Sequence, residues 1–370
     1  MLVGRDTTLH AGPVTHPRLN VLATDSAPEP ADYRYPFSPY PTGWYHLTPA
    51  AEVRAGQLVS KVFAGAEIVV WRTEQGFVRA SGAHCPHMGA HFGHGGAVHG
   101  EELWCPFHGF CFDGEGSCTK TGYETRPPKT ARLRMIPTVE RHGFVFGWHD
   151  NLGRAPRFEL PETDEDGWTG FRHHTFNLRG HPQETTENSV DIGHLSVVHG
   201  YSGIETLERL KLDGDLLTVR YAMSRNLDFL GQAGRSIRTE FSIVVEGLGY
   251  SRVEVHVPEL ELRSRHLVLS SPIDGDRIEL TVGLAVGALS AKAVHPLVGW
   301  VPDRLLRSAA HLGMFRAYVH DVSQDLAIWE NKAYVHPAQV AKGDGPIGRY
   351  RTWARRFYPE NETPTAAVSA

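Results

Sequence analysis

Two short segments, each pairing one cysteine with one histidine, constrain this 370-residue chain more than any other feature. The first is Cys85-Pro86-His87 and the second is Cys105-Pro106-Phe107-His108. Cysteine precedes histidine in both segments, so two equivalent loops would each offer one thiolate and one imidazole. Ligands of these two kinds at short spacing predict a metal centre.

The ligand set distinguishes between kinds of metal centre. In a Rieske [2Fe–2S] centre, two Cys sulfurs bind one iron and two His nitrogens bind the other. A zinc site would usually pair like ligands on one turn, as in C-x-x-C, and unrelated structural Cys and His residues are a third alternative. The repeated order favours the Rieske centre, with Cys85, His87, Cys105 and His108 as the predicted cluster ligands.

Cys111 and Cys118 are the two remaining cysteines. They could form a disulfide, but an iron–sulfur protein is expected in reducing cytoplasm, where disulfides rarely persist. We therefore predict two free buried thiols and a cytoplasmic location. Residues 1–6 do not resemble a secretory signal, and no apolar run is long enough to span a bilayer. The formal net charge of −5 gives no reason to propose nucleic acid as a partner.

The pattern of apolar residues divides the chain into three parts. Residues 1–40 show no periodicity and are interpreted as a loosely held N-terminal arm. Residues 41–150 alternate short apolar runs with Gly turns, which predicts an all-β domain with the Cys/His loops at hairpin tips. Residues 151–370 mix helical and strand-like patterns, which predicts an α+β domain with an antiparallel sheet flanked by helices. Its expected elements are helices over 184–199 and 302–335, with strands over 206–290.

A second group of metal-binding residue types lies in the third part. Asn188, Asp191, His194 and His199 follow the spacing N-x-x-D-x-x-H-x-x-x-x-H. With both motifs present, the chain resembles the large (α) subunit of the Rieske non-haem iron oxygenases over about residues 40–360. The resemblance implies that His194 and His199 bind a mononuclear Fe(II). Two His and one carboxylate on one face of such an iron leave the opposite face open to O2.

The spacing of the two histidines predicts a local irregularity. On a regular helix, five residues place His194 and His199 roughly 140° apart, so they would not converge on one ion. We therefore predict a π-bulge or a helix break between them, which Gly193 would ease.

The carboxylate ligand is expected on the helix over 302–335. Two acids of that helix, Asp325 and Glu330, each flank its apolar stripe at roughly 70°, whereas Asp321 lies roughly 110° away. Periodicity does not choose between the first two, and the resemblance selects Asp325. The stripe itself consists of Val319, Val322, Leu326, Trp329 and Ala333.

The resemblance also implies roles for the two remaining residues of the motif. In the family, the Asp hydrogen-bonds one iron-ligand His and one Rieske His, so Asp191 would connect His194 to His108 of the partner subunit. The two centres of one chain lie too far apart in that family, which implies a ring, most simply a homotrimer. From the residues alone, Asp191 could also be a helix cap or a surface acid. Asn188 is expected to line the iron pocket.

The expected reaction uses O2 and electrons from NAD(P)H. These electrons would come through a separate flavin reductase, with or without a ferredoxin, because no G-x-G-x-x-G fingerprint stands out in this chain. A Rieske electron carrier without oxygenase activity is the alternative from another functional class.

Four short runs resemble one branch of the family, the ketosteroid hydroxylases and cholesterol desaturases. That branch implies hydroxylation or desaturation of a bulky apolar substrate such as a steroid, a terpenoid or another natural product. It also resembles tailoring oxygenases that perform oxidative C–H cyclisation, which is a second alternative. The runs are His181–Glu184, Trp329–Tyr334, Gly343–Ile347 and Tyr350–Trp353.

Overall fold

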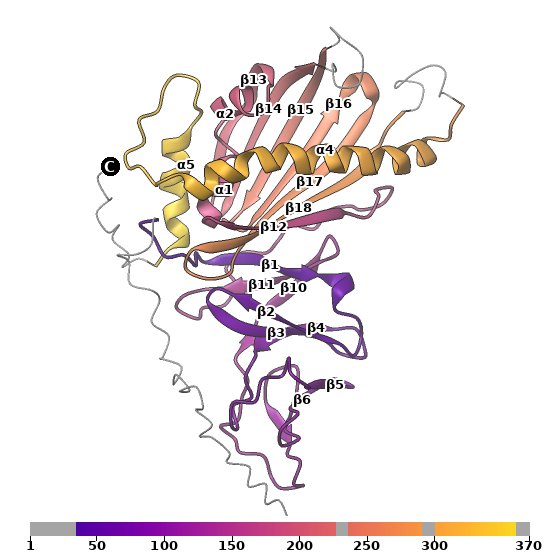
Figure 1. The fold of residues 1–370 in the computed structure, drawn as a ribbon, viewed down its shortest axis with the longest axis vertical. Helices are drawn as coiled ribbons and strands as arrows, with labels where there is room; N and C mark the ends of the chain where they lie inside the picture. Colours follow the sequence, from indigo (N-terminus) through magenta and orange to yellow (C-terminus); the bar gives the residue numbers. More distant parts are fainter. Residues whose placement is uncertain (1–34, 227–235, 291–299, 360–370) are drawn as a thin grey trace, which may run out of the picture.

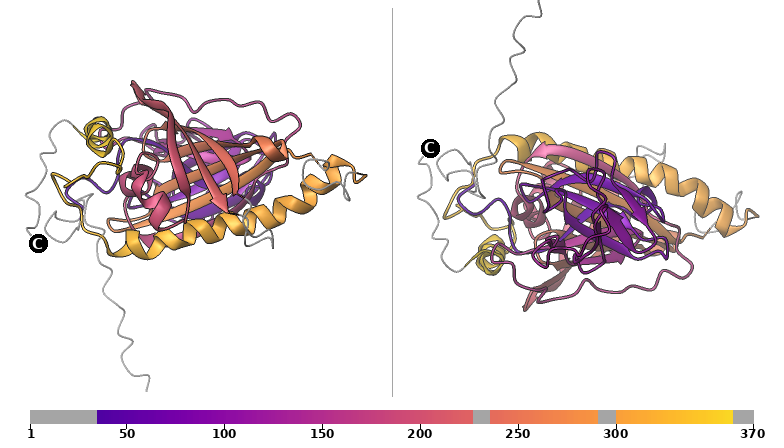
Figure 2. Two further views of the ribbon diagram at one scale, coloured as in Figure 1. Left: turned by 90° about the horizontal axis from the view of Figure 1, so that it is seen from above. Right: turned by 90° about the horizontal axis from the view of Figure 1, so that it is seen from below.

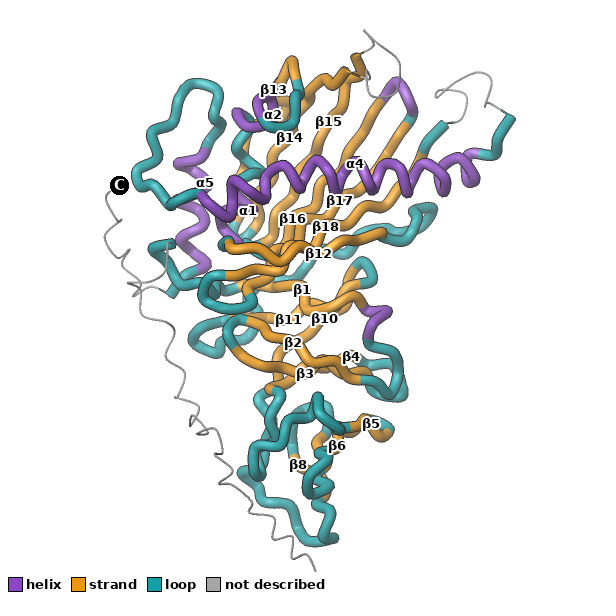
Figure 3. Tube along the Cα trace, viewed as in Figure 1, coloured by secondary structure: helices purple, strands orange, loops and turns teal. Residues whose placement is uncertain are grey.

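The computed structural model describes residues 35–226, 236–290 and 300–359. Figure 1 shows an elongated molecule, with small sheets from the first half of the chain at one end and a large sheet crossed by a long helix at the other. Figure 3 shows that the longer helices belong to the second half. The prediction of an all-β part followed by an antiparallel sheet with helices is confirmed. Most of the predicted arm, residues 1–34 of 1–40, lies outside the described residues.

The first half forms three antiparallel sheets. Its second sheet begins with a hairpin whose two turn residues, Ala64 and Gly65, both have positive φ, the conformation that a two-residue hairpin turn requires. The sheet orders are β1 (Gly43–Pro49), β11 (Phe144–His149) and β10 (Thr138–Arg141); β2 (Leu58–Phe63), β3 (Ala66–Arg72), β4 (Val78–Gly82) and β9 (Met135–Ile136); and β5 (Ala97–His99), β6 (Glu102–Trp104), β7 (Cys111–Phe112) and β8 (Cys118–Lys120).

The second half is organised around one seven-stranded antiparallel sheet. Six of its strands follow one another in a meander, and the seventh, β12, pairs with the last of them. The order across the sheet is β12 (Arg172–Arg179), β18 (Arg277–Ala288), β17 (Leu262–Pro272), β16 (Tyr250–Val257), β15 (Ser236–Glu246), β14 (Leu216–Asn226) and β13 (Ser202–Asp213).

Helix α4 (Asp303–Asn331) runs along one face of this sheet (Figure 2). The predicted helix over 302–335 is therefore present, and four of the five residues of its predicted stripe pack on the strands. Val319, Val322, Leu326 and Trp329 form one apolar cluster with Leu178, Ile278, Leu280 and Val282. Apolar burial of this kind is the main stabilising contribution to such a layer.

The opposite face of the sheet packs against the first half of the chain. Leu267 and Leu269 of β17 join a cluster with Trp44, Phe144 and Phe146 of the first sheet. The large sheet is thus covered by α4 on one side and by β1 and β11 on the other, which fixes the two halves against each other.

The prediction of one helix over 184–199 is wrong. This segment forms α1 (Pro182–Glu187) and α2 (Gly193–Val197), separated by five residues. Another helix, α5 (Ile347–Ala354), packs beside α1, and single 3₁₀ turns occupy Ala50–Glu52, Pro258–Leu260 and Arg355–Phe357. In the described part of the chain, no helix combines the length and apolarity needed to cross a membrane.

Candidate iron centres

The two Cys/His segments fold into equivalent loops. The Cys85 N–H donates to the Ala90 carbonyl, and the Gly89 N–H donates back to the Cys85 carbonyl. The second loop repeats this pattern, with the Cys105 N–H donating to Phe110 and the Gly109 N–H donating to Cys105. Gly89 and Gly109 both have positive φ, a conformation that glycine adopts without steric cost. The similarity expected from the repeated Cys-then-His order is therefore seen in the backbone.

The side chains of these loops fit an iron–sulfur cluster. The Cys85 and Cys105 side chains are buried and form no disulfide, and the rings of His87 and His108 lie with their centroids 4.7 Å apart. Nδ1 of His108 is buried without a hydrogen-bond partner among the described residues. Burial raises the pKa of the Cys85 thiol to about 12, so its deprotonation requires the positive charge of bound iron. Two thiols, two imidazoles and an unsatisfied ring nitrogen match the donor set of a Rieske centre.

The remaining cysteines behave nearly as predicted. Cys111 and Cys118 are both free, so the disulfide alternative is excluded. Cys111 is buried, whereas Cys118 is only partly buried, and the prediction of two buried thiols is correct for the first alone. The two thiols hydrogen-bond to the carbonyls of Gly109 and Lys120, respectively.

Asp191 lies in the five-residue segment between α1 and α2. Its Oδ1 accepts from the His194 N–H at 3.4 Å and lies 3.6 Å from Nδ1 of His194. Burial alone would raise the pKa of Asp191, but the His194 side chain and the nearby backbone N–H groups outweigh that effect and lower it. Asp191 is thus an ionised acid directly beside the first predicted iron-ligand His.

The structure brings together the three predicted iron ligands. One potential ligand atom each from His194, His199 and Asp325 lies within 4.8 Å of the others. Nε2 of His199 lies 3.4 Å from Oδ2 of Asp325, whose side chain is 9% exposed. Glu330, which periodicity left equally possible, is not in this group. Two imidazoles and one carboxylate grouped in this way fit the ligand set of a mononuclear non-haem Fe(II).

The predicted irregularity between the two histidines is present as a helix break. Helix α2 ends at Val197, before His199, and Gly200 then turns the chain with a φ of +69°. Gly193 begins α2 rather than lying at the break, so the expectation that it would ease the distortion is wrong.

Gln324 is a contact of the iron group that the sequence did not reveal. Its Oε1 lies 3.0 Å from Nδ1 of His199, so an Nδ1–H would donate to it and leave Nε2 facing Asp325. A neighbour of this kind fixes the tautomer and orientation of a metal-binding imidazole. Burial would lower the pKa of His199, but Asp325 and Gln324 raise it overall. In the sequence, only its position next to Asp325 pointed to Gln324 as a residue of the site.

The three residues border a cavity of about 380 Å³. Its walls come from five strands of the large sheet and from α4, and they are mainly apolar, with Met223, Val255, Leu284 and Met314 as examples. Asn188 and Asp191 line the same cavity, as expected for Asn188. Tyr221 and His266 are among the other polar side chains at the cavity, and they gave no sequence signal because they occupy ordinary alternating strand positions.

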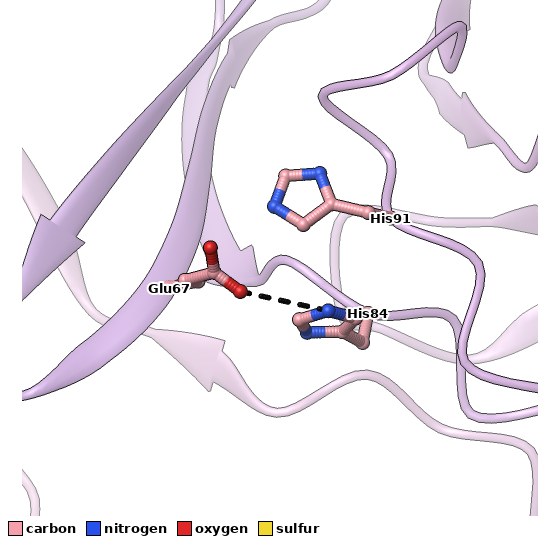
Figure 4. Close-up of side chains that lie close together, drawn as sticks. All are labelled: Glu67, His84 and His91. Atoms are coloured by element: carbon pink, nitrogen blue, oxygen red, sulfur yellow. Dashed lines mark ion pairs between the residues drawn. The ribbon is translucent and has the colours of Figure 1, made fainter. Parts of the chain in front are cut away.

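A second group of possible metal ligands lies on the first half of the chain. Figure 4 shows Glu67, His84 and His91, with His84 Nε2 3.6 Å from Glu67 Oε2. The Gly93 N–H donates to Nδ1 of His91, which places the proton of the neutral ring on Nε2, the nitrogen turned toward Glu67. A protonated nitrogen does not bind a metal, so this group is built as a hydrogen-bonding cluster on an exposed surface.

Comparison with known families places both halves of the chain. Residues 43–138 match the Rieske [2Fe-2S] domain, and residues 147–358 match the 3-ketosteroid 9alpha-hydroxylase C-terminal domain. The second match covers more than half of the chain and contains the His194, His199 and Asp325 group.

Curated relatives and solved structures agree with these matches. Cholesterol 7-desaturase of Bombyx mori is 29% identical, over 87% of this chain and 70% of that protein. The oxygenase component of 3-ketosteroid-9-alpha-monooxygenase of Rhodococcus rhodochrous is 27% identical, over 86% and 80%.

Two solved structures share the fold. Dicamba monooxygenase bound to dicamba has a TM-score of 0.60 at 17% identity, over 85% of this chain and 96% of that one. NdmA of Pseudomonas putida CBB5 with caffeine has a TM-score of 0.63 at 17% identity, over 84% and 89%.

These matches support the main function predicted from the sequence and neither of its alternatives, the simple electron carrier and the cyclising tailoring enzyme. The protein is an oxidoreductase with a Rieske cluster and a non-haem iron, and it uses O2 and electrons from a reductase. The chain belongs to the Rieske non-haem iron oxygenases that carry the 3-ketosteroid 9alpha-hydroxylase C-terminal domain.

Proposed function

We propose that this oxygenase hydroxylates or desaturates a steroid-like, multi-ring apolar substrate in the cavity beside His194, His199 and Asp325. The observation that carries the proposal is a largely apolar cavity that begins at these three ligands. Along α4 the cavity extends from Asp325 to Met314, eleven residues or roughly 16 Å of helix. Relatives that match over most of the chain are named for cholesterol and 3-ketosteroids, which are substrates of this shape.

In this proposal, the side chains bind and orient the metals and the substrate. Cys85, Cys105, His87 and His108 would hold the cluster. The two imidazoles and Asp325 would hold Fe(II), and Gln324 would orient His199. When bound, these metals supply the electron storage and oxygen activation that amino-acid side chains lack. Asn188 lines the cavity at the iron end, and the apolar walls exclude water from it.

We assign residues 1–40, 41–150 and 151–370 to an arm, a Rieske domain and a catalytic domain, and we place the enzyme in the cytoplasm. A flavin reductase, alone or with a ferredoxin, would deliver electrons from NAD(P)H. Figure 1 supports transfer between subunits: β5 and β6, next to the cluster loops, lie at the opposite end of the chain from α2. A homotrimer in which Asp191 contacts His108 of the partner subunit would bring the two centres together.

The surface around the cluster loops supports such a contact. His87 and His108 are only partly buried, and two apolar side chains of the same loops are exposed, Met88 at 65% and Phe107 at 61%. Exposed apolar groups around a functional site are typical of surfaces that a protein partner covers. Both the neighbouring subunit and the redox partner would approach this end of the molecule.

A reconstitution experiment tests the proposed function. The purified enzyme, a surrogate reductase, NADH and O2 are incubated with a panel of sterols, 3-ketosteroids and single-ring aromatics, and products are identified by mass spectrometry. We expect a product with one added oxygen, or with two hydrogens removed, from at least one multi-ring compound. Turnover confined to single-ring compounds would contradict the proposal.

The role of Asp191 is tested by Asp191→Ala. This variant should keep three irons per chain and the visible spectrum of the cluster, because Asp191 is not among the proposed ligands. Its turnover should fall by about 10- to 100-fold, an effect of the size that loss of a residue next to a metal ligand produces. Wild-type turnover in this variant would exclude the bridging role.

A further inference from the structure

His266 is a polar interruption in an otherwise aliphatic part of the cavity wall. On β17 it pairs across the sheet with Val253 on one side and Leu284 on the other. Ile243 continues the row beyond Val253. All four residues line the cavity, so the imidazole is the one polar side chain in this row.

Its ring is held in place by two neighbours. Nε2 lies 3.1 Å from the Ser264 hydroxyl oxygen, two residues earlier on the same face of β17. The Tyr318 ring packs edge-on against it, with centroids 4.4 Å apart, and the Tyr318 hydroxyl donates to the Leu267 carbonyl. The imidazole is therefore fixed by both the strand and α4.

The second ring nitrogen is available to a ligand. Nδ1 of His266 has no hydrogen-bond partner among the described residues, and it is not one of the fully enclosed polar atoms. A polar atom in an apolar cavity is costly to leave unsatisfied, whereas a ligand atom that completes its hydrogen bond gains affinity. The position of this nitrogen thus specifies a hydrogen-bonding group on the ligand.

The charge state of the ring limits what this group is. Burial lowers the pKa of His266 to about 4, so the ring is neutral near pH 7. A neutral imidazole donates to or accepts from an uncharged oxygen, and it offers no ion pair to a carboxylate. With Ser264 donating to Nε2, Nδ1–H would donate to a ketone or hydroxyl. With the opposite tautomer, Nδ1 would accept from a hydroxyl.

The distance between His266 and the iron ligands determines how long a substrate must be to reach both. Tyr318, which contacts His266, precedes Asp325 by seven residues, or roughly 10 Å along the axis of α4. A ligand that reaches from His266 to the iron therefore needs a skeleton several rings long. A single aromatic ring would not span this separation.

We propose that His266, held by Ser264, binds a neutral hydroxyl or ketone oxygen of the multi-ring substrate and thereby determines which carbon faces the iron. This inference rests on the proposed function and names the chemical feature that the cavity selects. His266 is a specificity-determining residue in this account and takes no part in oxygen activation.

The test compares ligands that differ by one oxygen. Equilibrium dialysis of the iron-loaded enzyme measures the affinity for a 3-hydroxysteroid, the matched 3-ketosteroid and the matched deoxy hydrocarbon. The same series is measured for His266→Leu, His266→Gln and Leu284→Met. The last variant is the control, because it reshapes the adjacent wall without changing its polarity.

We expect at least one oxygenated ligand to bind the wild type about tenfold more tightly than the hydrocarbon, as one hydrogen bond allows. This preference should fall below about threefold in His266→Leu, recover in part in His266→Gln and persist in Leu284→Met. Preference for the ketone over the hydroxyl, or the reverse, identifies the working tautomer.

Two failures are distinguishable. If multi-ring ligands bind and are oxidised, but His266→Leu keeps the full oxygen preference, His266 has a packing role and the inference is wrong. If no multi-ring ligand binds or reacts with the wild type, the proposed function itself is wrong, and the inference fails with it.

Discussion

Arg351 shows how one residue supports the iron site from outside it. Its guanidinium donates to both carboxylate oxygens of Glu187, at 2.7 and 2.9 Å, and Glu187 ends α1 just before Asn188. The two side chains are 13% and 9% exposed. Arg351 also donates to the Val335 carbonyl and stacks over Tyr334. This single side chain therefore ties α1, α5 and the segment after α4 together.

We predict that Arg351→Ala destabilises the protein by about 3 kcal/mol, because it leaves the buried Glu187 carboxylate without its main partner. The thermal unfolding midpoint of the second half of the chain should fall by about 6–12 °C. Arg349→Ala, on the exposed side of the same helix, is the control and should change stability by less than about 0.5 kcal/mol. Equal midpoints for the two variants would refute this role of the ion pair.

Glu246 gives a second prediction for a single residue, which concerns how the stability of the fold depends on pH. Burial, together with nearby Asp215, raises its pKa from 4.5 to about 7. Because the folded-state pKa lies above the unfolded-state value, folding favours the protonated form, and stability is lost as pH rises from about 4.5 to 7. Glu246→Gln, which keeps the neutral form at every pH, should therefore be more stable than the wild type at pH 8.

The difference at pH 8 should be about 1 kcal/mol, after allowing for the solvent that partly screens this group. It should shrink toward zero near pH 5, as measured by thermal unfolding at both pH values. Glu240→Gln is the control on the same strand, since Arg220 and Arg238 lie near its carboxylate and neutralising it should not stabilise the fold. A pH-independent difference for Glu246→Gln would contradict the assignment.

At the scale of elements, the segment between α1 and α2 depends on a loop far away in the chain. A Cβ on Gly345, which has a φ of +89°, would overlap the Val190 carbonyl oxygen. The preceding residue, Asp344, lies beside Gly193, the first residue of α2. The short run Gly343–Ile347, noted in the sequence for its family resemblance, thus has a physical function: it supports the residues around Asp191.

We predict that Gly345→Ala displaces this segment and costs about 1–3 kcal/mol through backbone strain and overlap. The mononuclear iron content should fall while the visible spectrum of the Rieske cluster is unchanged. Gly348→Ala in α5 is the matched control, because nothing lies within 4 Å of its added methyl group and alanine favours a helix. Normal iron loading of Gly345→Ala would show that the loop contact is not needed.

Much at this scale could be predicted from the sequence. The apolar stripe of α4 and the alternation along β14 and β16 depend on nearby residues, so periodicity revealed them. The break after Glu187 could not be predicted, because the segment that follows it packs against Gly345, more than 150 residues later in the chain. The cavity was equally inaccessible, since strands and α4 enclose it jointly and no single segment shows its shape.

The residues of the candidate site likewise divide into those that the sequence predicted and those that it did not. Cys85, His87, Cys105 and His108 were predictable because cluster ligands have a distinctive type and spacing. Asp325 needed the family resemblance, since Glu330 fits the helical period equally well, and the structure groups Asp325 with the two histidines. Gln324 and His266 act through contacts with residues on other elements, which a single sequence does not contain.

At the scale of the whole molecule, the position of the two centres determines how the enzyme would work. The cluster loops lie next to β5 and β6 at one end of the molecule, and α2, which carries His194, lies near the other end (Figure 1). Exposed Met88 and Phe107 beside the cluster histidines leave an apolar surface for a second copy to cover. A closed ring of identical subunits would place each cluster beside the iron of its neighbour.

Mixed oligomers test this arrangement most directly. One variant, Cys105→Ser, lacks a cluster ligand, and the other, His199→Ala, lacks an iron ligand. The two carry different affinity tags, are co-expressed, and oligomers containing both are purified and assayed with the reductase. Oligomers of either variant alone are the controls, and both should be inactive.

If electrons cross between subunits, the mixed oligomers should recover about a third of the wild-type rate, because a trimer that contains both variants has an intact cluster beside an intact iron site at one of its three interfaces. If electrons stay within one chain, every chain in the mixture lacks one of its two centres. Mixed oligomers as inactive as the single-variant controls would therefore contradict the account.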